Sequence, residues 1–291
     1  MNKKKLVIIA VSVILGLALI AGGVFALIRI LDKDDSEYVE KTYSYEEAME
    51  ILDSGNKKEG IAALRTVKGS AAEKKRKELY TSIFGEEFYN NIHNAKVGDV
   101  IEFGHFDQDD NYNNGKEAVE WVVLDKKEDG RMLLLTKYAI ECVRYHKKAV
   151  PITWEECFLR SWLNDGFIKD CFTEEESWII PTTYVKNDDN PKYGTEGGND
   201  TLDQVFLLSI EEADRYFEDN LARKTSATET AKLHFAYSDP FNNTAWWLRS
   251  PSFQPDMAAL VADDGDLYDG AFHKVTELYI STRPALWIDL S

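Results

Sequence analysis

The sequence predicts an α+β domain that follows a short helical segment and an N-terminal transmembrane helix. A long apolar run near the N-terminus indicates the transmembrane helix. Apolar side chains then recur at helical spacing over residues 44–94. Over residues 95–291, β-rich runs flank helices without the regular strand–helix alternation of a parallel sheet, which favours the α+β class.

The apolar run extends from Leu6 to Ile28. It exceeds the roughly 20 residues that a helix needs to cross a hydrocarbon core. A cleavable signal peptide has a shorter apolar region, of about 7 to 15 residues, before its cleavage site. Apolar residues continue here beyond the small residues "IAGG" at 20–23, so we favour an uncleaved anchor, with cleavage as the alternative. Residues 1–31 are then a cytoplasmic tip and a transmembrane anchor.

Charge sets the predicted orientation and restricts the partners. Lys3, Lys4 and Lys5 precede the apolar run and an acidic stretch follows it, so the positive-inside tendency predicts a single-pass protein of the cell membrane with the bulk of the chain extracellular. The chain has 34 Lys and Arg against 51 Asp and Glu, for a net charge of −17. Such a surface repels phosphate backbones, which argues against nucleic acid as a partner.

Residues 32–43 are predicted to be a charged linker, and residues 44–94 a helical segment. Ser44 and Glu47 form a capping box, and Gly55 is a suitable stop for the first helix. The segment resembles a degenerate tetratricopeptide-type helix pair with a third helix. Binding solenoids need about three such repeats, so we interpret the segment as a stalk or a packing element beside the main domain.

The main domain begins with β-rich runs. "KVGDVIEFGHF" predicts a strand over 96–106, and the runs 117–125 and 130–140, joined by "KKEDG", predict a hairpin. An amphipathic helix is predicted over 151–167, with Thr153 and Glu156 as its capping box. A buried strand then ends at Ser209, which caps the next helix together with Glu212. Short strands are predicted around 246–249, 259–262 and 285–290.

Catalytic and metal motifs have little support in this sequence. It contains no GxSxG, HExxH or CxxC pattern, and its histidines are scattered singly. Its cysteines, Cys142, Cys157 and Cys171, are too few and odd in number for a disulfide framework. One bridge among them and buried free thiols are both compatible with the sequence.

In order, the segments "VGDVIEFGHF", "VEWVVLD", "MLLLTKYAI", "TWEECFLRSWLNDGF", "DQVFLLSIEEA", "WWLRSP" and "TRPALWIDL" resemble a bacterial family of domains of unknown function, number 6273, over residues 95–291. The closing pattern "WWLRSP…DG…RPAL" is also similar to the C-type-lectin-like fold of formylglycine-generating enzymes and of diversified receptor proteins. That similarity implies a C-type-lectin-like domain with a loop-rich ligand surface. The cysteines that the enzymes need in their C-terminal half are absent here, so that activity does not carry over.

The signature residues of this pattern are Trp246, Trp247, Arg249 and Arg283. Successive side chains of a strand face opposite ways, so Trp246 and Trp247 are expected on opposite faces. One lies in the core, and the other shares with Arg249 a second face covered by loops. Arg249 is expected to be buried against a carboxylate or backbone carbonyls. We interpret the motif as a core element, with a stacking platform for a sugar or peptide as the alternative.

The acidic segment "ADDGDLYDGAFHKV", residues 262–275, follows the motif. Counted from Asp264, the fifth position of a calcium loop would be Tyr268, so a hairpin turn is the better interpretation. A loop that starts at Asp109 fails similarly, because Gly115 comes one residue late. We therefore predict no cofactor or metal, with Ca²⁺ kept open. The resemblance places ligand contacts in the first segment, and the candidates are Asp266, Tyr268, Asp269, Phe272 and His273.

These observations predict a membrane-anchored extracellular binding module for a protein, peptide or glycan, without catalytic residues. A hydrolase or modifying enzyme that acts on cell-wall material or polysaccharide is the first alternative, and it would need two converging carboxylates in a cleft. A structural subunit of an envelope complex is the second. An exposed aromatic patch near 253–280 would favour binding, and acidic side chains buried together in a pocket would favour an enzyme.

Overall fold

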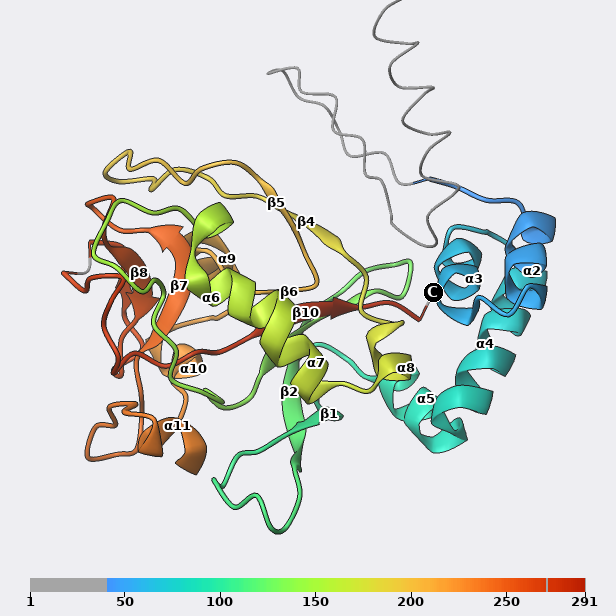
Figure 1. Ribbon diagram of the computed structural model, residues 1–291, viewed down its shortest axis with the longest axis horizontal. Helices are drawn as coiled ribbons and strands as arrows, with labels where there is room; N and C mark the ends of the chain where they lie inside the picture. The colour runs from blue at the N-terminus through green and yellow to red at the C-terminus, as the bar shows by residue number, and fades with distance from the viewer. Residues whose placement is uncertain (1–40, 271, 291) are drawn as a thin grey trace, which may run out of the picture. The chain divides into compact units, whose positions relative to one another are not determined.

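The main sheet has five antiparallel strands in the order β1-β2-β3-β10-β6 and is seen in a computed structural model that describes residues 41–270 and 272–290. Its strands are β1 (Val100–Phe106), β2 (Glu117–Lys126), β3 (Met132–Thr136), β6 (Val205–Phe206) and β10 (Ala285–Ile288). The predicted hairpin joins β2 and β3, which pair in antiparallel register. The last strand of the chain, β10, lies between β3 and β6 (Figure 1).

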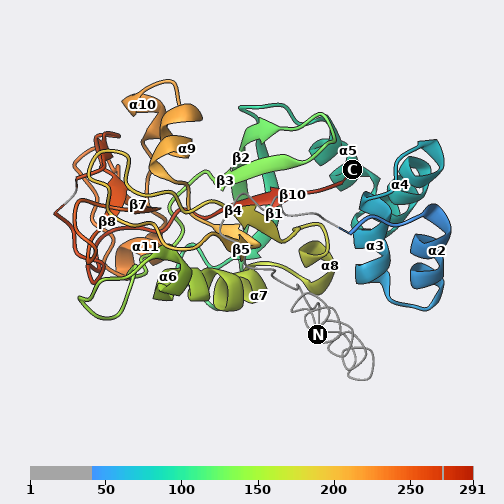
Figure 2. The same cartoon turned by 90° about the horizontal axis from the view of Figure 1, so that it is seen from above.

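Two smaller antiparallel sheets complete the β-structure. Strands β7 (Trp246–Pro251), β8 (Ala258–Val261) and β9 (Leu267–Tyr268) form one of them, and β4 (Thr183–Val185) and β5 (Thr201–Asp203) form the other. Figures 1 and 2 both show β7 and β8 at the end of the main sheet that is remote from the helices of residues 45–84. The loops at that end carry the segment predicted to contact a ligand.

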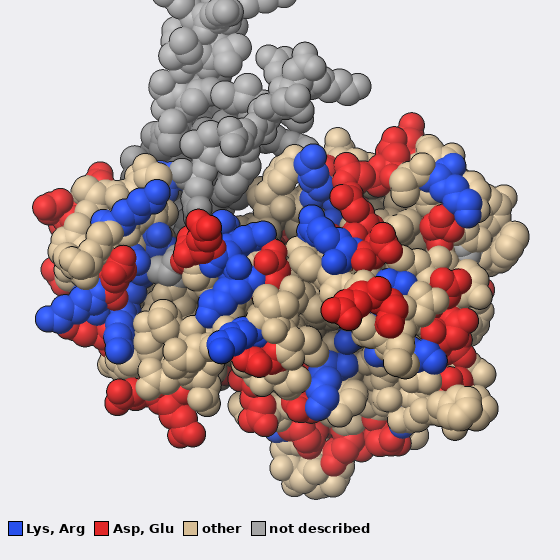
Figure 3. Space-filling model, turned by 180° about the vertical axis from the view of Figure 1, so that it is seen from behind, with Lys and Arg blue, Asp and Glu red and all other residues tan. Residues whose placement is uncertain are grey.

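Residues 45–94 form the helices α2 (Tyr45–Asp53), α3 (Lys57–Arg65), α4 (Ser70–Phe84) and α5 (Glu86–Asn94). The predicted capping box at Ser44 and Glu47 is confirmed, with the Glu47 backbone N–H donating to Ser44 Oγ at 3.2 Å. Tyr80 and Ile92 belong to the same hydrophobic core as the main sheet. The helical segment therefore serves as a packing element. On the face in Figure 3, Lys and Arg side chains are concentrated over this part of the chain.

The middle of the chain differs from the single helix predicted over 151–167. It contains a 3₁₀ turn at Trp154–Glu156, then α6 (Phe158–Ser161), the π-helix η2 (Trp162–Phe167) and α7 (Ile168–Cys171). The predicted capping box is wrong, because Thr153 makes no side-chain cap hydrogen bond. Cys157 caps α6 instead, its Sγ accepting from the Arg160 N–H at 3.3 Å. The buried Trp154, whose Nε1 donates to Asp203 at 2.9 Å, holds the turn against β5.

Four further helices are short: α8 (Glu174–Ser177), α9 (Ile210–Arg215), α10 (Asn220–Arg223) and α11 (Glu229–Leu233). The predicted capping box of Ser209 and Glu212 at the start of α9 is confirmed. In α10, Arg223 is buried, and its Nε donates to the Gly265 carbonyl at 2.9 Å. The short helices α9 and α10 thus connect the main sheet with the β8–β9 hairpin.

The motif around β7 is buried on both faces. Trp246 and Trp247 are both 0 % exposed. Trp246 Nε1 donates to the Arg223 carbonyl at 3.3 Å, while the Trp247 ring lies edge-on to Tyr145 at 5.8 Å. The two indoles therefore contact different surroundings, as strand alternation predicts, and loops and helices cover the second face.

Arg249 is 4 % exposed, and all of its donors are used. Its Nε and Nη2 donate to the Lys186 carbonyl at 3.1 and 3.0 Å. Its Nη1 donates to the Leu207 carbonyl at 2.8 Å, and the guanidinium also forms an ion pair with Glu212 of α9. Arg249 thus meets both a carboxylate and backbone carbonyls, the two kinds of partner expected for it.

Arg283 is buried, and no carboxylate among the described residues pairs with it. It donates to the carbonyls of Thr136, Arg223 and Lys137 at 2.9, 3.3 and 3.4 Å, and its guanidinium lies 5.0 Å from the Trp246 ring centroid. Burial lowers the pKa of Arg283 to about 9, so the side chain is still protonated at neutral pH. The carbonyls and the indole face together solvate this charge.

The predicted fold class requires a correction. No helix within residues 41–270 and 272–290 is long and apolar enough to cross a membrane. Even α4, with 15 residues, is shorter than the roughly 20 that a span needs, and it carries a run of charged side chains. The predicted transmembrane helix at 6–28 lies outside the described residues, and membrane attachment and an extracellular location gain no support from those that are described. What is observed is a mixed α+β structure with antiparallel sheets.

The cysteines are free thiols buried in the protein. Burial raises the pKa of Cys142 and of Cys157 to about 12, and also raises that of Cys171. Each thiol therefore stays protonated in the folded state at neutral pH, which makes it a poor nucleophile.

We predict that native full-length protein resists alkylation at about pH 8 and reacts at all of its thiols only in denaturing urea.

The burial of the thiols also makes the stability of the folded protein sensitive to alkaline pH. The pKa of Cys157 in the folded protein exceeds its value of 9.0 in the unfolded chain. The stabilisation that comes from burying the neutral thiol is therefore fully present below pH 9.0 and is lost as the pH rises towards about 12. Urea denaturation at increasing pH, compared between wild type and Cys157→Ala, measures the effect. Rapid alkylation of the native protein would contradict the burial of these thiols.

We predict that Arg249→Met lowers the free energy of unfolding by about 3 to 5 kcal/mol, because Glu212 and the carbonyls lose their buried partner. Arg215→Met, on the exposed side of α9, is the matched control and is expected to change it by less than about 0.5 kcal/mol. Urea denaturation followed by circular dichroism measures both. A similar, small loss in the two variants would show that the Arg249 network is not a principal support of the fold.

Candidate functional site

The predicted ligand segment forms the β8–β9 hairpin and the loop after it. The turn is closed by the Gly265 N–H, which donates to the Ala262 carbonyl at 2.9 Å. Gly265 has φ +86°, and a Cβ at this position would lie 1.8 Å from the Asn220 carbonyl oxygen. Only glycine fits this turn. Because β8 and β9 on either side of it pair in antiparallel register, the segment is a hairpin, as the sequence favours.

The candidate residues of this segment contact different neighbours. Asp266 is exposed on the turn and accepts from Asn220 Nδ2 at 3.3 Å. Tyr268 is 43 % exposed in β9. His273 Nδ1 lies 3.0 Å from the Tyr279 hydroxyl.

Asp269 holds the loop against its neighbour. Its carbonyl accepts from Asn190 Nδ2 at 2.9 Å and from Ser252 Oγ at 3.2 Å, and its carboxylate lies 3.4 Å from Lys192 Nζ. Asn190 is 1 % exposed, and its Oδ1 also accepts from the N–H groups of Lys192 and Tyr193, both at 3.0 Å. This Asx-type turn presents the Tyr193 ring beside the predicted segment.

An aromatic cluster of Tyr193, Phe253 and Phe272 joins the surrounding loops. The ring centroids of Phe253 and Phe272 are 5.0 Å apart, and those of Tyr193 and Phe253 are 6.0 Å apart. Phe272 is 81 % exposed and Tyr193 is 46 % exposed. Only Phe272 was among the predicted residues, because the contacts join loops that are far apart in the sequence.

A second feature, which the sequence reasoning missed, is a cavity of about 340 Å³ that we term the acidic pocket. Its lining comprises Phe106, Asp107, Tyr112, Glu141, Trp162, Gly166, Phe167, Asp170, Thr230 and His234. Its carboxylates come from three separate parts of the chain, and its aromatic residues from β1, the following loop and η2.

Two carboxylates of the acidic pocket are buried and are oriented by the protein. Asp107 is 7 % exposed, and its Oδ1 accepts from the Asp110 N–H at 2.8 Å and from the Thr230 hydroxyl at 3.2 Å. Glu141 is 9 % exposed, and its Oε1 accepts from the Cys142 N–H at 2.7 Å and lies 2.8 Å from His234 Nδ1. The third carboxylate, Asp170, is paired with Lys116 at the rim.

Tyr112, which lines the acidic pocket, lies near several carboxylates. The pKa of this exposed tyrosine is raised, chiefly by the charge of Asp110, with partial desolvation and the charges of Asp107 and Glu141 adding to the effect. Anionic neighbours oppose the formation of a phenolate. A cation that entered the pocket would meet the opposite, favourable field.

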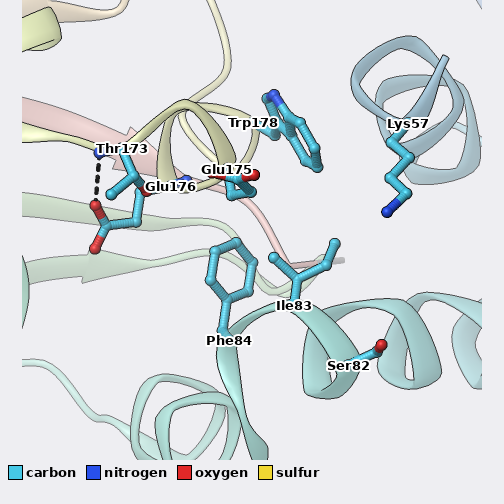
Figure 4. Close-up of a pocket in the computed structure, with 8 residues that line it drawn as sticks. All are labelled: Lys57, Ser82, Ile83, Phe84, Thr173, Glu175, Glu176 and Trp178. Atoms are coloured by element: carbon cyan, nitrogen blue, oxygen red, sulfur yellow. Dashed lines mark hydrogen bonds between the residues drawn. The ribbon is translucent and has the colours of Figure 1, made fainter.

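A further cavity of about 450 Å³ lies between the helical segment and α8. In Figure 4, Ile83 and Phe84 project from α4 towards Trp178, and Lys57 reaches in from α3. Glu176 is already used, accepting from the Thr173 N–H at 2.8 Å. Within the described residues, Trp178 Nε1 has no hydrogen-bond partner. The groove combines the apolar side chains of Ile83, Phe84 and Trp178 with polar and charged residues from α3, α4 and α8.

Among the described residues, the group with metal-ligand proximity is Asp107, Asp109 and Glu117, whose ligand atoms lie within 4.8 Å of one another. Each of these side chains already accepts a backbone N–H, from Asp110, Asn111 and Gln108 respectively, at 2.8 to 2.9 Å. These hydrogen bonds hold the three carboxylates in the loop.

We predict that millimolar Ca²⁺ leaves the melting temperature of the full-length protein unchanged, because these carboxylates are already held by backbone donors. Thermal melting in Ca²⁺ and in a chelator is the measurement. A rise in Ca²⁺ that disappears in Asp109→Asn would contradict this and identify a calcium site at the loop.

The observed architecture is an α+β domain with antiparallel sheets, whose loops carry an aromatic cluster and whose helix–sheet junction holds an acidic pocket. The chain belongs to a family described as a domain of unknown function (DUF6273), whose model matches residues 129–290, more than half of the chain. This confirms the family resemblance seen in the sequence. The match leaves out β1 and β2, although both strands belong to the main sheet.

No curated protein and no solved structure matches the chain. The C-type-lectin-like fold that the closing motif implied is therefore unsupported by a structural relative. We describe the fold by its own topology, as an α+β structure with antiparallel sheets.

Proposed function

We propose that this chain is a binding module that recognises an extracellular protein, peptide or glycan through the aromatic cluster of Tyr193, Phe253 and Phe272. The proposal rests on one observation, the contiguous exposure of these rings on loops. Solvent-exposed apolar groups that contact one another are characteristic of interaction sites. Loops held by a rigid scaffold are also where binding residues concentrate.

The chemistry around the aromatic cluster suits a ligand with both apolar and polar faces. Phe253 and Phe272 meet at an interplanar angle of 64°, which leaves faces and edges open for stacking. Lys192 and Asp269 lie beside Tyr193 and supply charged groups of both signs. A sugar ring and an aromatic or aliphatic peptide side chain both fit such a surface.

The alternative of a hydrolase is supported less well. Asp107 and Glu141 line one cavity, as an enzyme would require. Each of them, however, already accepts a hydrogen bond from a neighbouring backbone N–H, which ties the carboxylate to the local fold. The alternative of an envelope subunit that makes contact through the helical segment uses a surface that is in part already packed on the main sheet.

We predict that Phe272→Ala weakens ligand binding by about two- to tenfold, since an aromatic contact contributes about 0.5 to 1.5 kcal/mol. The double variant with Tyr193→Ala is expected to lose more. The full-length chain is screened first against arrays of glycans, wall fragments and peptides, and the variants are then titrated with the ligand found.

Phe241→Ala is the matched control, because Phe241 is 85 % exposed and Phe272 is 81 % exposed. Removal of Phe241 should leave the affinity unchanged, and melting curves should agree for all variants. Equal affinity of wild type and the Tyr193/Phe272 double variant would refute this role of the aromatic cluster. Binding on the glycan array or on the peptide array would show which of these two classes the ligand belongs to.

A further inference from the structure

We infer that the acidic pocket binds an organic cation, an alkylammonium or guanidinium group, as a site separate from the aromatic cluster. The pocket combines buried carboxylates with aromatic walls in a cavity of about 340 Å³. This size accommodates a small amine or the end of a lysine or arginine side chain.

The first support is the unused acceptor capacity of Asp107 and Glu141. Among the described residues, the hydrogen bonds to these side chains end on Asp107 Oδ1 and Glu141 Oε1. The second oxygen of each carboxylate is left as an acceptor, and both residues line the pocket. A buried anion with an open acceptor gains most from a donor that carries positive charge.

The second support is the apolar wall. The Phe167 ring centroid lies 5.4 Å from that of Phe106 and 5.6 Å from that of Trp162. Aromatic faces attract ammonium and guanidinium groups, and Trp does so most strongly. A metal ion gains no ligand from phenyl and indole rings, because its ligands in proteins are oxygen, nitrogen and sulfur atoms.

The third support is the local backbone. Trp162, Gly166 and Phe167 all belong to the π-helix η2, and π-helical turns occur frequently at functional sites. Next to His234, Phe235 has φ +83°, a conformation that is strained for a bulky side chain. Such irregular backbone persists where the surrounding structure requires a particular side-chain arrangement.

Charge decides between a cationic and a neutral ligand. The Asp170 charge is compensated by Lys116. Asp107 and Glu141 have no Lys or Arg partner among the described residues, and of the pocket's lining only His234 can carry a positive charge. The ligand's cation would supply the missing countercharge.

The test titrates the full-length protein with butylammonium, with butylguanidinium and with a lysine-containing peptide, by calorimetry at low ionic strength. We expect saturable binding that N-ε-acetylation of the peptide abolishes. Glu141→Gln and Asp107→Asn keep the acceptor oxygens of their internal hydrogen bonds, and each is expected to weaken binding by about tenfold or more. Trp162→Ala should weaken it as well.

Asp165→Asn is the matched control, because Asp165 lies on η2 with its side chain 81 % exposed and the substitution removes the same charge. The affinity of Asp165→Asn for the organic cations should equal that of wild type. Phe272→Ala should also bind them with wild-type affinity, because Phe272 belongs to the aromatic cluster and not to the acidic pocket. Unchanged affinity in Glu141→Gln and Asp107→Asn would overturn the inference. Binding of Zn²⁺ or Mn²⁺ in preference to the amines would overturn it in favour of a metal site. Stronger binding of the peptide than of butylammonium would identify a protein as the source of the cation.

Discussion

A single buried guanidinium, that of Arg249, organises the half of the domain that carries the loops. It ties β7 to the segment after β4 through Lys186, to the end of β6 through Leu207 and to α9 through Glu212. The same Glu212 carboxylate accepts the Ser209 N–H that starts α9, so a helix cap and an ion pair share one group. A charge desolvated to this degree is tolerated when its donors find acceptors, and each acceptor of Arg249 comes from a segment that must therefore lie beside β7.

The two proposed sites are held together by different contacts. The aromatic cluster lies on loops that leave β7 and β9, so its rings stay together only while those strands and the buried Asn190 amide hold their positions. The acidic pocket is assembled at the junction of β1, η2 and α11, where the Thr230 hydroxyl connects α11 with Asp107. The domain thus separates a stacking surface from a charged cavity, and the chemistry of the two is complementary.

Local patterns were predicted well and distant contacts were not. The capping boxes at Ser44 and Ser209 depend on neighbours three residues away, so the sequence was sufficient to find them. The box at Thr153 failed because the buried Trp154 imposes a 3₁₀ turn through a contact 49 residues away. Glu141 and His234 are 93 residues apart, so a histidine that looked isolated in the sequence is one half of a pair. The family was recognisable because its motifs are short and ordered, whereas a π-helix leaves no periodic signal.

The position of β10 has a consequence for biosynthesis. This strand occupies residues 285–288, yet it lies between β3 and β6 in the interior of the main sheet. Until residues 285–288 are available to pair, the edges of β3 and β6 that β10 covers lack their partner strand. Insertion of β10 between β3 and β6 therefore completes the main sheet after its other strands have been synthesised. A chain without residues 285–288 would lack the strand that joins β6 to the rest of the sheet.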